Sequence, residues 1–377
     1  MKILHVYKTY HPDTFGGIEQ VIAQLGRALT ARGHQNRIFT LSRRPGPPVL
    51  ERPEGEVHRS RTTAEAASNP VSLAAFSEFR RQAAWADVLH YQFPWPFGDL
   101  LHVCCARGKP SIVSYQSDVV RQKWLRHAYL PLMNRFLGSV GMVVATSPEY
   151  RDSSPVLSHL GGKVRVIPNG IDERSYPPPR AERLAHWRER LGEGFLLFIG
   201  VLRYYKGLHT LLQACEGFAG RVVIAGDGPQ AWALQKHAAD QRLANVTLLG
   251  SVTDEDKVCL LELARAFVLP SHLRAEAFGM SLLEAAMFGK PMVTCEIGTG
   301  MSHVNRHGVT GWTVPPEDPD ALRAAMTMLL HDAGQATAMG AAARHRFETL
   351  FTARQMASAY ESAYLDVLAA KRYAAAV

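Results

Sequence analysis

Short apolar runs alternate with helical stretches along almost the whole chain. In the first half these runs lie near residues 2–7, 35–40, 87–91, 110–114, 141–146 and 163–167. In the second half they lie near residues 195–200, 221–225, 246–249, 266–269 and 291–294. Regular strand–helix alternation is typical of parallel sheets covered by helices. We therefore expect an α/β protein with a doubly wound sheet in each half.

The domain boundaries follow from the same pattern. A proline-rich linker at residues 176–179 separates the two halves, which have ordinary domain sizes. We expect an N-terminal domain over residues 1–170 and a second domain over residues 171–352. Residues 353–377 begin with an amphipathic pattern that predicts a C-terminal helix. Residues 42–53, rich in proline, glycine and arginine, are interpreted as a surface loop of the first domain.

Composition is consistent with an intracellular globular protein. The 377 residues are 47% hydrophobic and 20% charged, which suffices for two buried cores. No run of about 18 apolar residues is present, and the N-terminus enters a strand without a signal-peptide pattern, so we expect a cytoplasmic location. The cysteines have neither disulfide nor zinc-finger spacing and are expected to be buried thiols: Cys104, Cys105, Cys215, Cys259 and Cys295.

Positive charge is concentrated in the first half of the chain. Residues 1–170 hold 21 Lys and Arg against 12 Asp and Glu, whereas the remainder holds 21 against 22. No recognisable nucleic-acid-binding module accompanies this charge. Basic residues around Trp124 favour an anionic membrane surface as the partner, although an ordinary solvated basic face is the alternative. The residues concerned are Arg80, Arg81, Arg121, Lys123, Arg126 and Arg135.

Two glutamates flank the start of a predicted helix in the second half. The apolar spacing after Gly279 predicts the helix, with Glu276 just before its start and Glu284 inside it. Free amides at a helix N-terminus bind anions, and carboxylates on either side would accept hydrogen bonds from sugar hydroxyls. The segment follows the strand at 266–269, where open sheets bind ligands, so a sugar nucleotide fits. Alternatively, Glu276 is only an acidic residue that stabilises the start of the helix, and Glu284 is an exposed residue on the helix surface.

This segment resembles the E-x7-E motif of the retaining nucleotide-sugar glycosyltransferases of family 4. Four further stretches resemble family signatures in the same order: Gly16-Gly17, residues 166–172, Lys206-Gly207 and residues 224–229. The resemblance implies a GT-B fold, with two facing Rossmann-like domains and a C-terminal helix crossing back to the first domain.

The resemblance also implies a set of site residues. Arg203, Lys206 and Glu276 are the expected catalytic residues, with the two cations stabilising the departing diphosphate. The family's arginine position, just after Gly200, holds Val201, so we expect Arg203 to replace that arginine. The expected donor-binding residues are Gly16, Gly17, Arg203, Lys206, Glu276, Phe278, Gly279, Met280, Ser281 and Glu284.

The acceptor-side residues that the resemblance implies are Gln116 and Asp118. Gln116 occupies the position where family members commonly have a histidine. Because glutamine cannot titrate near neutral pH, it cannot serve as an acid or base. This favours a front-face mechanism in which the leaving phosphate oxygen accepts the proton of the acceptor hydroxyl. For Asp118 the alternative is a helix-capping role.

We expect neither a catalytic metal nor a cofactor. The tract from Asp254 to Asp256 resembles the metal-binding D-x-D motif of another glycosyltransferase fold. However, it precedes a helical pattern, and acids that open a helix explain it better.

The finer resemblance is to bacterial mannosyl- and D-rhamnosyltransferases of O-polysaccharide assembly. Residues 117–123, 204–207 and 298–311 carry it. It implies a GDP-mannose or GDP-D-rhamnose donor and a growing lipopolysaccharide glycan on undecaprenyl diphosphate, with the enzyme peripheral at the inner membrane face. A UDP-sugar such as UDP-N-acetylglucosamine is an alternative donor. Because Val201 and Gln116 depart from the family pattern, a noncatalytic protein that binds sugar nucleotides is a further alternative.

Overall fold

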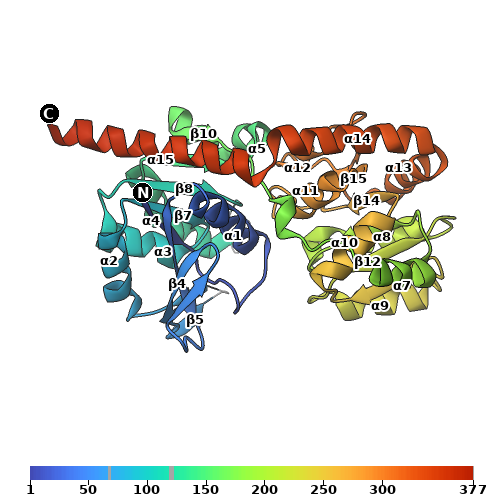
Figure 1. Ribbon diagram of the computed structural model, residues 1–377, viewed down its shortest axis with the longest axis horizontal. Coiled ribbons are helices and arrows are strands. Elements are labelled where there is room, and N and C mark those ends of the chain that lie inside the picture. The colour runs from blue at the N-terminus through green and yellow to red at the C-terminus, as the bar shows by residue number, and fades with distance from the viewer. Residues whose placement is uncertain (67–68, 119–122, 377) are drawn as a thin grey trace. The chain divides into compact units, whose positions relative to one another are not determined.

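The structure is a computed structural model that describes residues 1–66, 69–118 and 123–376 (Figure 1). Contacts between residues divide the chain into two units. Unit 1 comprises residues 1–170 together with residues 353–377, and unit 2 comprises residues 171–352. Each unit is built on its own Rossmann-like sheet.

Unit 1 contains an eight-stranded sheet in the order β10-β9-β8-β7-β1-β2-β4-β3. Its pairs are parallel except for β3 with β4. A separate antiparallel pair joins β5 to β6. The strands are β1 (Lys2–Val6), β2 (Gln35–Ser42), β3 (Val49–Arg52), β4 (Gly55–Arg61), β5 (Ala64–Ala66), β6 (Asn69–Val71), β7 (Val88–Phe93), β8 (Ser111–Tyr115), β9 (Met142–Ala145) and β10 (Val164–Val166).

Helices pack against this sheet, and the last one comes from the far end of the chain. The helix α15 contacts α1 and β8, so the C-terminal segment completes unit 1. Among the described residues, no helix is both long and apolar enough to span a membrane. The helices are α1 (Gly17–Thr30), α2 (Ala75–Trp85), α3 (Pro96–Leu101), the π-helical η1 (His102–Ala106), α4 (Lys123–Ser139), α5 (Pro148–Ser153), α6 (Pro155–Leu160), the 3₁₀ turn η2 (Gly161–Lys163) and α15 (Ala353–Ala376).

The prediction of a loop at residues 42–53 was wrong in part, because the strand β3 lies within this segment. A hairpin turn joins β3 to β4, which also pairs with β2 in the sheet. Arg59 stabilises this region from β4: its buried guanidinium lies 2.7 Å from Asp13 and donates to the Arg44 carbonyl at 2.8 Å. Arg59 therefore ties the segment before β3 to β4.

Unit 2 contains a fully parallel six-stranded sheet in the order β13-β12-β11-β14-β15-β16. Five of its strands were predicted, and β16 was not. The strands are β11 (Leu196–Ile199), β12 (Val222–Ala225), β13 (Val246–Gly250), β14 (Ala266–Leu269), β15 (Met292–Cys295) and β16 (Gly311–Val314).

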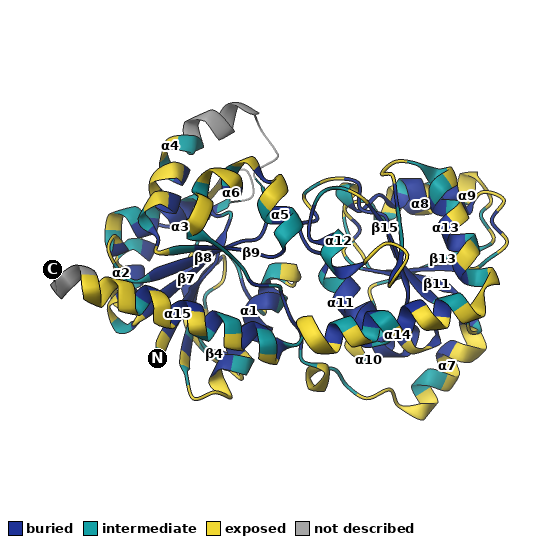
Figure 2. Ribbon diagram, turned by 90° about the horizontal axis from the view of Figure 1, so that it is seen from above, coloured by how far each residue is buried: buried dark blue, intermediate teal, exposed yellow. Residues whose placement is uncertain are grey.

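The helices of unit 2 follow its strands along the chain. Figure 2 shows β7 and β8 of unit 1 and β11 and β15 of unit 2 as buried, with exposed residues on the outer faces of the helices. The helices are η3 (Glu173–Ser175), α7 (Ala181–Leu191), η4 (Tyr204–Lys206), α8 (Leu208–Cys215), α9 (Ala231–Asp240), α10 (Asp254–Leu263), α11 (Met280–Met287), α12 (Met301–Val304), α13 (Pro319–His331) and α14 (Ala333–Leu350).

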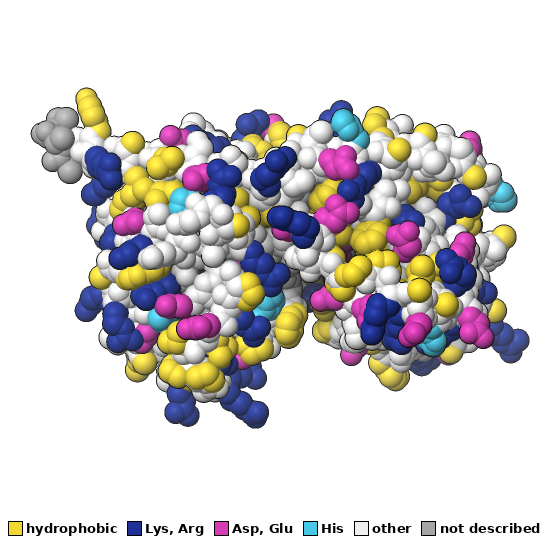
Figure 3. Space-filling view, in the orientation of Figure 1, with side chains coloured by type: hydrophobic (Ala, Val, Ile, Leu, Met, Phe, Trp, Pro, Cys, Tyr) yellow, Lys and Arg dark blue, Asp and Glu magenta, His cyan; other side chains and the backbone are white. Residues whose placement is uncertain are grey.

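The basic surface predicted around Trp124 is described only in part. Arg121 lies outside the described residues, and so do the side chains of Lys123, Trp124 and Arg126. Figure 3 shows Lys and Arg side chains scattered over the visible face of unit 1, between hydrophobic and acidic ones.

Candidate active site

The turn that carries Lys206 lies against the carboxyl end of β14. This turn, η4 followed by Gly207, leads from β11 into α8. Gly207 has a φ of +69°, and a Cβ there would collide with the carbonyl oxygen of Pro270. Glycine is therefore required both by the left-handed backbone and by the close approach. The packing brings Lys206 next to the segment that contains Glu276.

Lys206 and Glu276 form a buried ion pair. The ammonium donates to Glu276 Oε2, and the two residues are only 9% and 8% exposed. Ser271 Oγ lies 3.5 Å from the same carboxylate oxygen. Burial lowers the pKa of Lys206, but the charge and hydrogen bond of Glu276, together with Tyr205, outweigh burial and raise the pKa. Lys206 is therefore a fixed positive charge at neutral pH, as the predicted contact with a diphosphate requires.

The helix after Glu276 begins at Met280, with Gly279 as its N-cap at a φ of +82°. Its first amides have no acceptor within the helix, and their dipoles favour an anion. Ser281 Oγ is buried without a hydrogen-bond partner in the described structure. Phe278 is buried in the core of unit 2, where its ring packs edge-on against Phe351. Phe278 thus supports the loop, while Ser281 leaves an unused polar atom at the helix start.

Glu284 is buried rather than solvated. Its Oε1 accepts from Tyr176 Oη at 2.8 Å and from Lys257 Nζ at 2.9 Å. Neither partner was predicted: Tyr176 lies in the segment interpreted as a linker, and Lys257 follows the acidic tract. A tyrosine and a lysine on one carboxylate fix its orientation. The ribose-binding role of Glu284 stays a prediction.

Arg203, the expected replacement for the missing arginine, is the N-cap of η4. It is exposed and makes no side-chain hydrogen bond or ion pair with a described residue. Its positive charge acts on Lys206, three residues later in the chain, by lowering the pKa of that ammonium against the effect of Glu276. Val201, at the family's arginine position, is 39% exposed. An unpaired arginine beside a paired lysine is suited to meet an incoming anion.

In unit 1, Gly16 is the N-cap of α1 and Gly17 is its first residue. A Cβ on Gly16 would lie 2.7 Å from Glu19 Oε2. Thr14 Oγ1 donates to the other oxygen of Glu19 at 2.7 Å, which holds the carboxylate beside the glycine. A Cβ on Gly16 would therefore require the Glu19 carboxylate to shift. The approach of a diphosphate to these glycines stays a prediction.

Gln116 is part of a buried polar network in unit 1. Gln116 Nε2 donates to Gln92 Oε1 at 2.9 Å, and Gln92 Nε2 lies 3.3 Å from His90 Nε2. The other nitrogen of His90, Nδ1, lies 2.8 Å from the hydroxyl of Tyr364 on α15. Ser114 Oγ lies 2.7 Å from His90 Nε2 and 2.5 Å from the hydroxyl of a second α15 tyrosine, Tyr360. The C-terminal helix is thus connected by hydrogen bonds to the predicted acceptor-side residue.

Asp118 has structural partners within unit 1. Its Oδ1 accepts from Tyr115 Oη at 3.1 Å and from Ser154 Oγ at 2.7 Å. Ser154 is the N-cap of α6, which begins at Pro155 and divides the single helix predicted at residues 148–160. Residues 119–122, which follow Asp118, lie outside the described residues. The acceptor-binding role of Asp118 therefore stays a prediction.

The acidic tract at residues 254–256 opens a helix, as predicted. Thr253 is the N-cap of α10 and forms a capping box with Asp256. Asp256 also accepts from Trp187 Nε1 at 2.8 Å and from Arg183 at 2.5 Å. These hydrogen bonds hold the pKa of the carboxyl well below its usual range. Asp256 is therefore engaged in packing α10 against α7.

Protein-family models match both halves of the chain. Residues 15–175 match the model described as Glycosyltransferase Family 4, and residues 180–346 match the model described as Glycosyl transferases group 1. The chain is also 52% identical over 353 residues to D-rhamnosyltransferase WbpZ of Pseudomonas aeruginosa, covering 94% of this chain and 93% of that protein. It is 44% identical to O-antigen chain mannosyltransferase C of Escherichia coli, covering 98% and 100% respectively.

Solved structures share the fold at low sequence identity. Sucrose-phosphate synthase from Thermosynechococcus elongatus superposes with a TM-score of 0.81 at 22% identity, covering 98% of this chain and 99% of that one. The Anabaena protein HepE, in complex with UDP and glucose, gives a TM-score of 0.79 at 17% identity, covering 97% and 100%.

Proposed function

The chain belongs to glycosyltransferase family 4, and we propose that it transfers a D-rhamnosyl or mannosyl residue from a GDP-sugar to a lipid-linked glycan. The product would be part of a lipopolysaccharide O-polysaccharide. The buried pair of Lys206 and Glu276 before the start of α11 carries the chemical part of this proposal. The choice of sugar is supported by the two relatives of 52% and 44% identity.

The proposed reaction is a front-face substitution with retention at the anomeric carbon. The bond between that carbon and the diphosphate oxygen breaks as the carbon becomes cation-like. The acceptor hydroxyl oxygen forms the new bond from the same face. Its proton passes to the departing phosphate oxygen, so no protein base is needed. What the protein supplies is position and charge stabilisation.

Each site residue has a role in this proposal. Lys206, held by Glu276, is the fixed cation for the diphosphate, and Arg203 adds a second cation from the exposed end of the same turn. The free amides at the start of α11 add donors. The Glu276 carboxylate accepts sugar hydroxyls or faces the cation-like carbon. With two cations present, we propose that transfer needs neither a metal nor a cofactor.

The acceptor and location are proposed on chemical grounds. A glycan on undecaprenyl diphosphate is made at the inner face of the cytoplasmic membrane, where anionic lipids attract basic proteins. Unit 1 holds 24 Lys and Arg against 14 Asp and Glu, whereas unit 2 holds 18 against 20. A peripheral position with unit 1 toward the lipid surface is consistent with this difference.

The test is a transfer assay with a panel of GDP- and UDP-sugars. The acceptor is a synthetic lipid-diphosphate N-acetylglucosamine, offered with and without added mannose or D-rhamnose residues, in the presence and absence of EDTA. We expect turnover with GDP-D-rhamnose or GDP-mannose that survives EDTA. Turnover with UDP-sugars alone would overturn the proposed donor, and donor binding without product would indicate a noncatalytic protein.

A further inference from the structure

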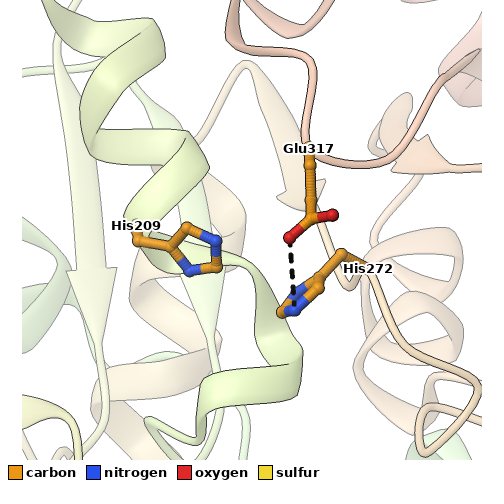
Figure 4. A group of neighbouring side chains, drawn as sticks. All are labelled: His209, His272 and Glu317. Atoms are coloured by element: carbon orange, nitrogen blue, oxygen red, sulfur yellow. Dashed lines mark ion pairs between the residues drawn. The ribbon is translucent and has the colours of Figure 1, made fainter.

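Three side chains of unit 2 that no part of the proposed reaction uses converge beside the Lys206 turn (Figure 4). They are His209 in the first turn of α8, His272 after β14 and Glu317 after β16. One nitrogen or oxygen from each lies within 4.8 Å of the others, and His272 Nε2 is 3.9 Å from Glu317 Oε1. The three residues, called here the His-His-Glu cluster, come from segments far apart in sequence.

His272 is the buried member of the cluster. Its side chain is only 2% exposed, and neither ring nitrogen has a hydrogen-bond partner in the described structure. A buried imidazole with two unused nitrogens is unusual, because an unpaired buried polar group costs about 1–3 kcal/mol. The ring also packs edge-on against His209 and Tyr204, at centroid distances of 5.0 and 4.9 Å. The surrounding residues thus hold the imidazole in place without providing hydrogen bonds to its nitrogens.

The other two members are positioned by separate means. His209 stacks on Tyr204 with an interplanar angle of 6°, which fixes the plane of its ring. Glu317 has a φ of +58°, a left-handed conformation that is unfavourable for a residue with a side chain. Such strain is commonly retained at functional positions. In Figure 4 the carboxylate of Glu317 points toward His272, and the His209 ring borders the same space.

We propose that the His-His-Glu cluster binds a divalent transition metal ion of the zinc class. Two imidazoles and one carboxylate are the ligand set that suits zinc, whereas Mg²⁺ and Ca²⁺ prefer oxygen ligands. Burial lowers the pKa of both imidazoles, which favours the neutral form that a metal needs. Three protein ligands leave a fourth position for water.

The cluster needs only a small contraction to reach zinc geometry. Zinc bonds of about 2.0–2.2 Å place tetrahedral ligand atoms about 3.3 Å apart. The separations, none above 4.8 Å, therefore have to shrink by at most roughly 1.5 Å. Glu317, whose side chain is 62% exposed, is free to move by that amount, and His272 is not. Side-chain rotation at Glu317 and His209 is the expected adjustment.

A metal at this position would tie three segments of unit 2 together. The His272 amide donates to the Tyr205 carbonyl at 3.0 Å, so the cluster already adjoins the Lys206 turn. Binding would link that turn, the β14–α11 loop and the loop after β16. We assign the ion a clamping role. It supplies no positive charge to the proposed reaction, which uses Lys206 and Arg203.

The test is Zn²⁺ binding by the full chain after removal of metals with EDTA and dialysis. Isothermal titration with Zn²⁺ gives the affinity, and Co²⁺ gives the visible absorption bands of a four-coordinate site. The informative variants are His209→Ala and Glu317→Gln, because neither residue is fully buried and both variants are expected to fold. His331→Ala, at the exposed end of α13, is the matched control.

We expect one Zn²⁺ bound per chain, weakened by at least about tenfold in His209→Ala and Glu317→Gln and unchanged in His331→Ala. Zn²⁺ should also raise the melting temperature of the wild type and of the control more than that of either variant. Equal binding by all four proteins, or none by the wild type at millimolar Zn²⁺, would overturn the proposal. Because no sugar nucleotide is added, this outcome is independent of the transfer assay.

Discussion

At the scale of single residues, the Lys206–Glu276 pair gives the sharpest test of the site. Glu276→Gln removes the charge that holds Lys206 and leaves a buried ammonium unpaired. We expect kcat to fall about 100-fold, because the carboxylate stabilises charge in the reaction. The free energy of unfolding should also fall, by about 3 kcal/mol. Steady-state kinetics and urea unfolding of the same sample measure both effects.

The control for this variant is Lys236→Ala, which breaks an exposed ion pair with Asp240 on α9. Surface pairs contribute about 0–1 kcal/mol, so neither kinetics nor unfolding should change appreciably. Near-normal turnover of Glu276→Gln in a folded protein would exclude both proposed roles of the carboxylate.

Arg203 provides a second residue-scale prediction. Because its side chain is exposed and unpaired among the described residues, Arg203→Ala should leave stability within about 0.5 kcal/mol of the wild type. If Arg203 contacts the diphosphate, kcat/KM for the donor should fall by at least about tenfold. Arg203→Lys tests whether a point charge suffices. Unchanged donor kinetics in Arg203→Ala would mean that Arg203 does not replace the family arginine whose position Val201 occupies.

The buried His102 should make stability depend on pH. Burial lowers the pKa of this imidazole from 6.5 to about 4. Between these values the unfolded chain binds a proton that the folded protein does not, so stability falls as pH drops through 6.5 toward 4. At pH 5 the loss from His102 alone is about 2 kcal/mol relative to pH 7. Urea unfolding at both pH values should show a smaller loss in His102→Gln, and an equal loss would contradict this.

Lys206 and Glu276 lie 70 residues apart, so the sequence pattern alone could not pair them. The resemblance to family 4 named both residues, and the structure joins them in an ion pair. Their roles in the reaction stay predictions. The partners of Glu284 were missed because Tyr176 and Lys257 lie 108 and 27 residues away from it. The His-His-Glu cluster was missed for the same reason, since its members are brought together by strand order alone.

At the scale of elements, α15 is expected to act on Gln116 through the buried network of unit 1. Tyr364→Phe removes the hydroxyl beside His90 Nδ1 and leaves that nitrogen unpaired. We expect the free energy of unfolding to fall by about 1–3 kcal/mol. If the network positions Gln116, the KM for acceptor should rise while that for donor changes little.

The matched control lies on the same helix. Tyr373 is 75% exposed, so Tyr373→Phe should alter neither quantity. A loss of stability in Tyr364→Phe without any change in acceptor KM would limit the network to a structural role.

Elements with clear apolar periodicity were predicted to within a few residues, and polar ones were not. The strand β4 reads Gly-Glu-Val-His-Arg-Ser-Arg, so its burial depends on ion pairs rather than on an apolar face. The strand β16 has four residues and a half-buried centre. The helix break at Ser154 coincides with Pro155, the first residue of α6, which lacks the amide needed to continue the preceding helix. The prediction of a single helix overlooked this local signal.

At the scale of the whole molecule, the uneven charge predicts salt-dependent binding to anionic membranes. The formal net charge is +10 for unit 1 and −2 for unit 2. We expect sedimentation with vesicles containing phosphatidylglycerol at low salt and release by about 0.5 M NaCl, where screening is strong. Vesicles of phosphatidylcholine alone are the control. Equal binding to both vesicles, or binding insensitive to salt, would argue against an electrostatic contact.

The helix α15 has a consequence for the order in which the protein acquires its structure during synthesis. The ribosome produces residues 171–352 before it produces the segment that completes unit 1. Until then His90 and Ser114 lack the tyrosine hydroxyls that they pair with in the finished protein. In a nascent chain, unit 2 can therefore fold first. Unit 1, although translated earlier, completes its folding only after α15 has been synthesised.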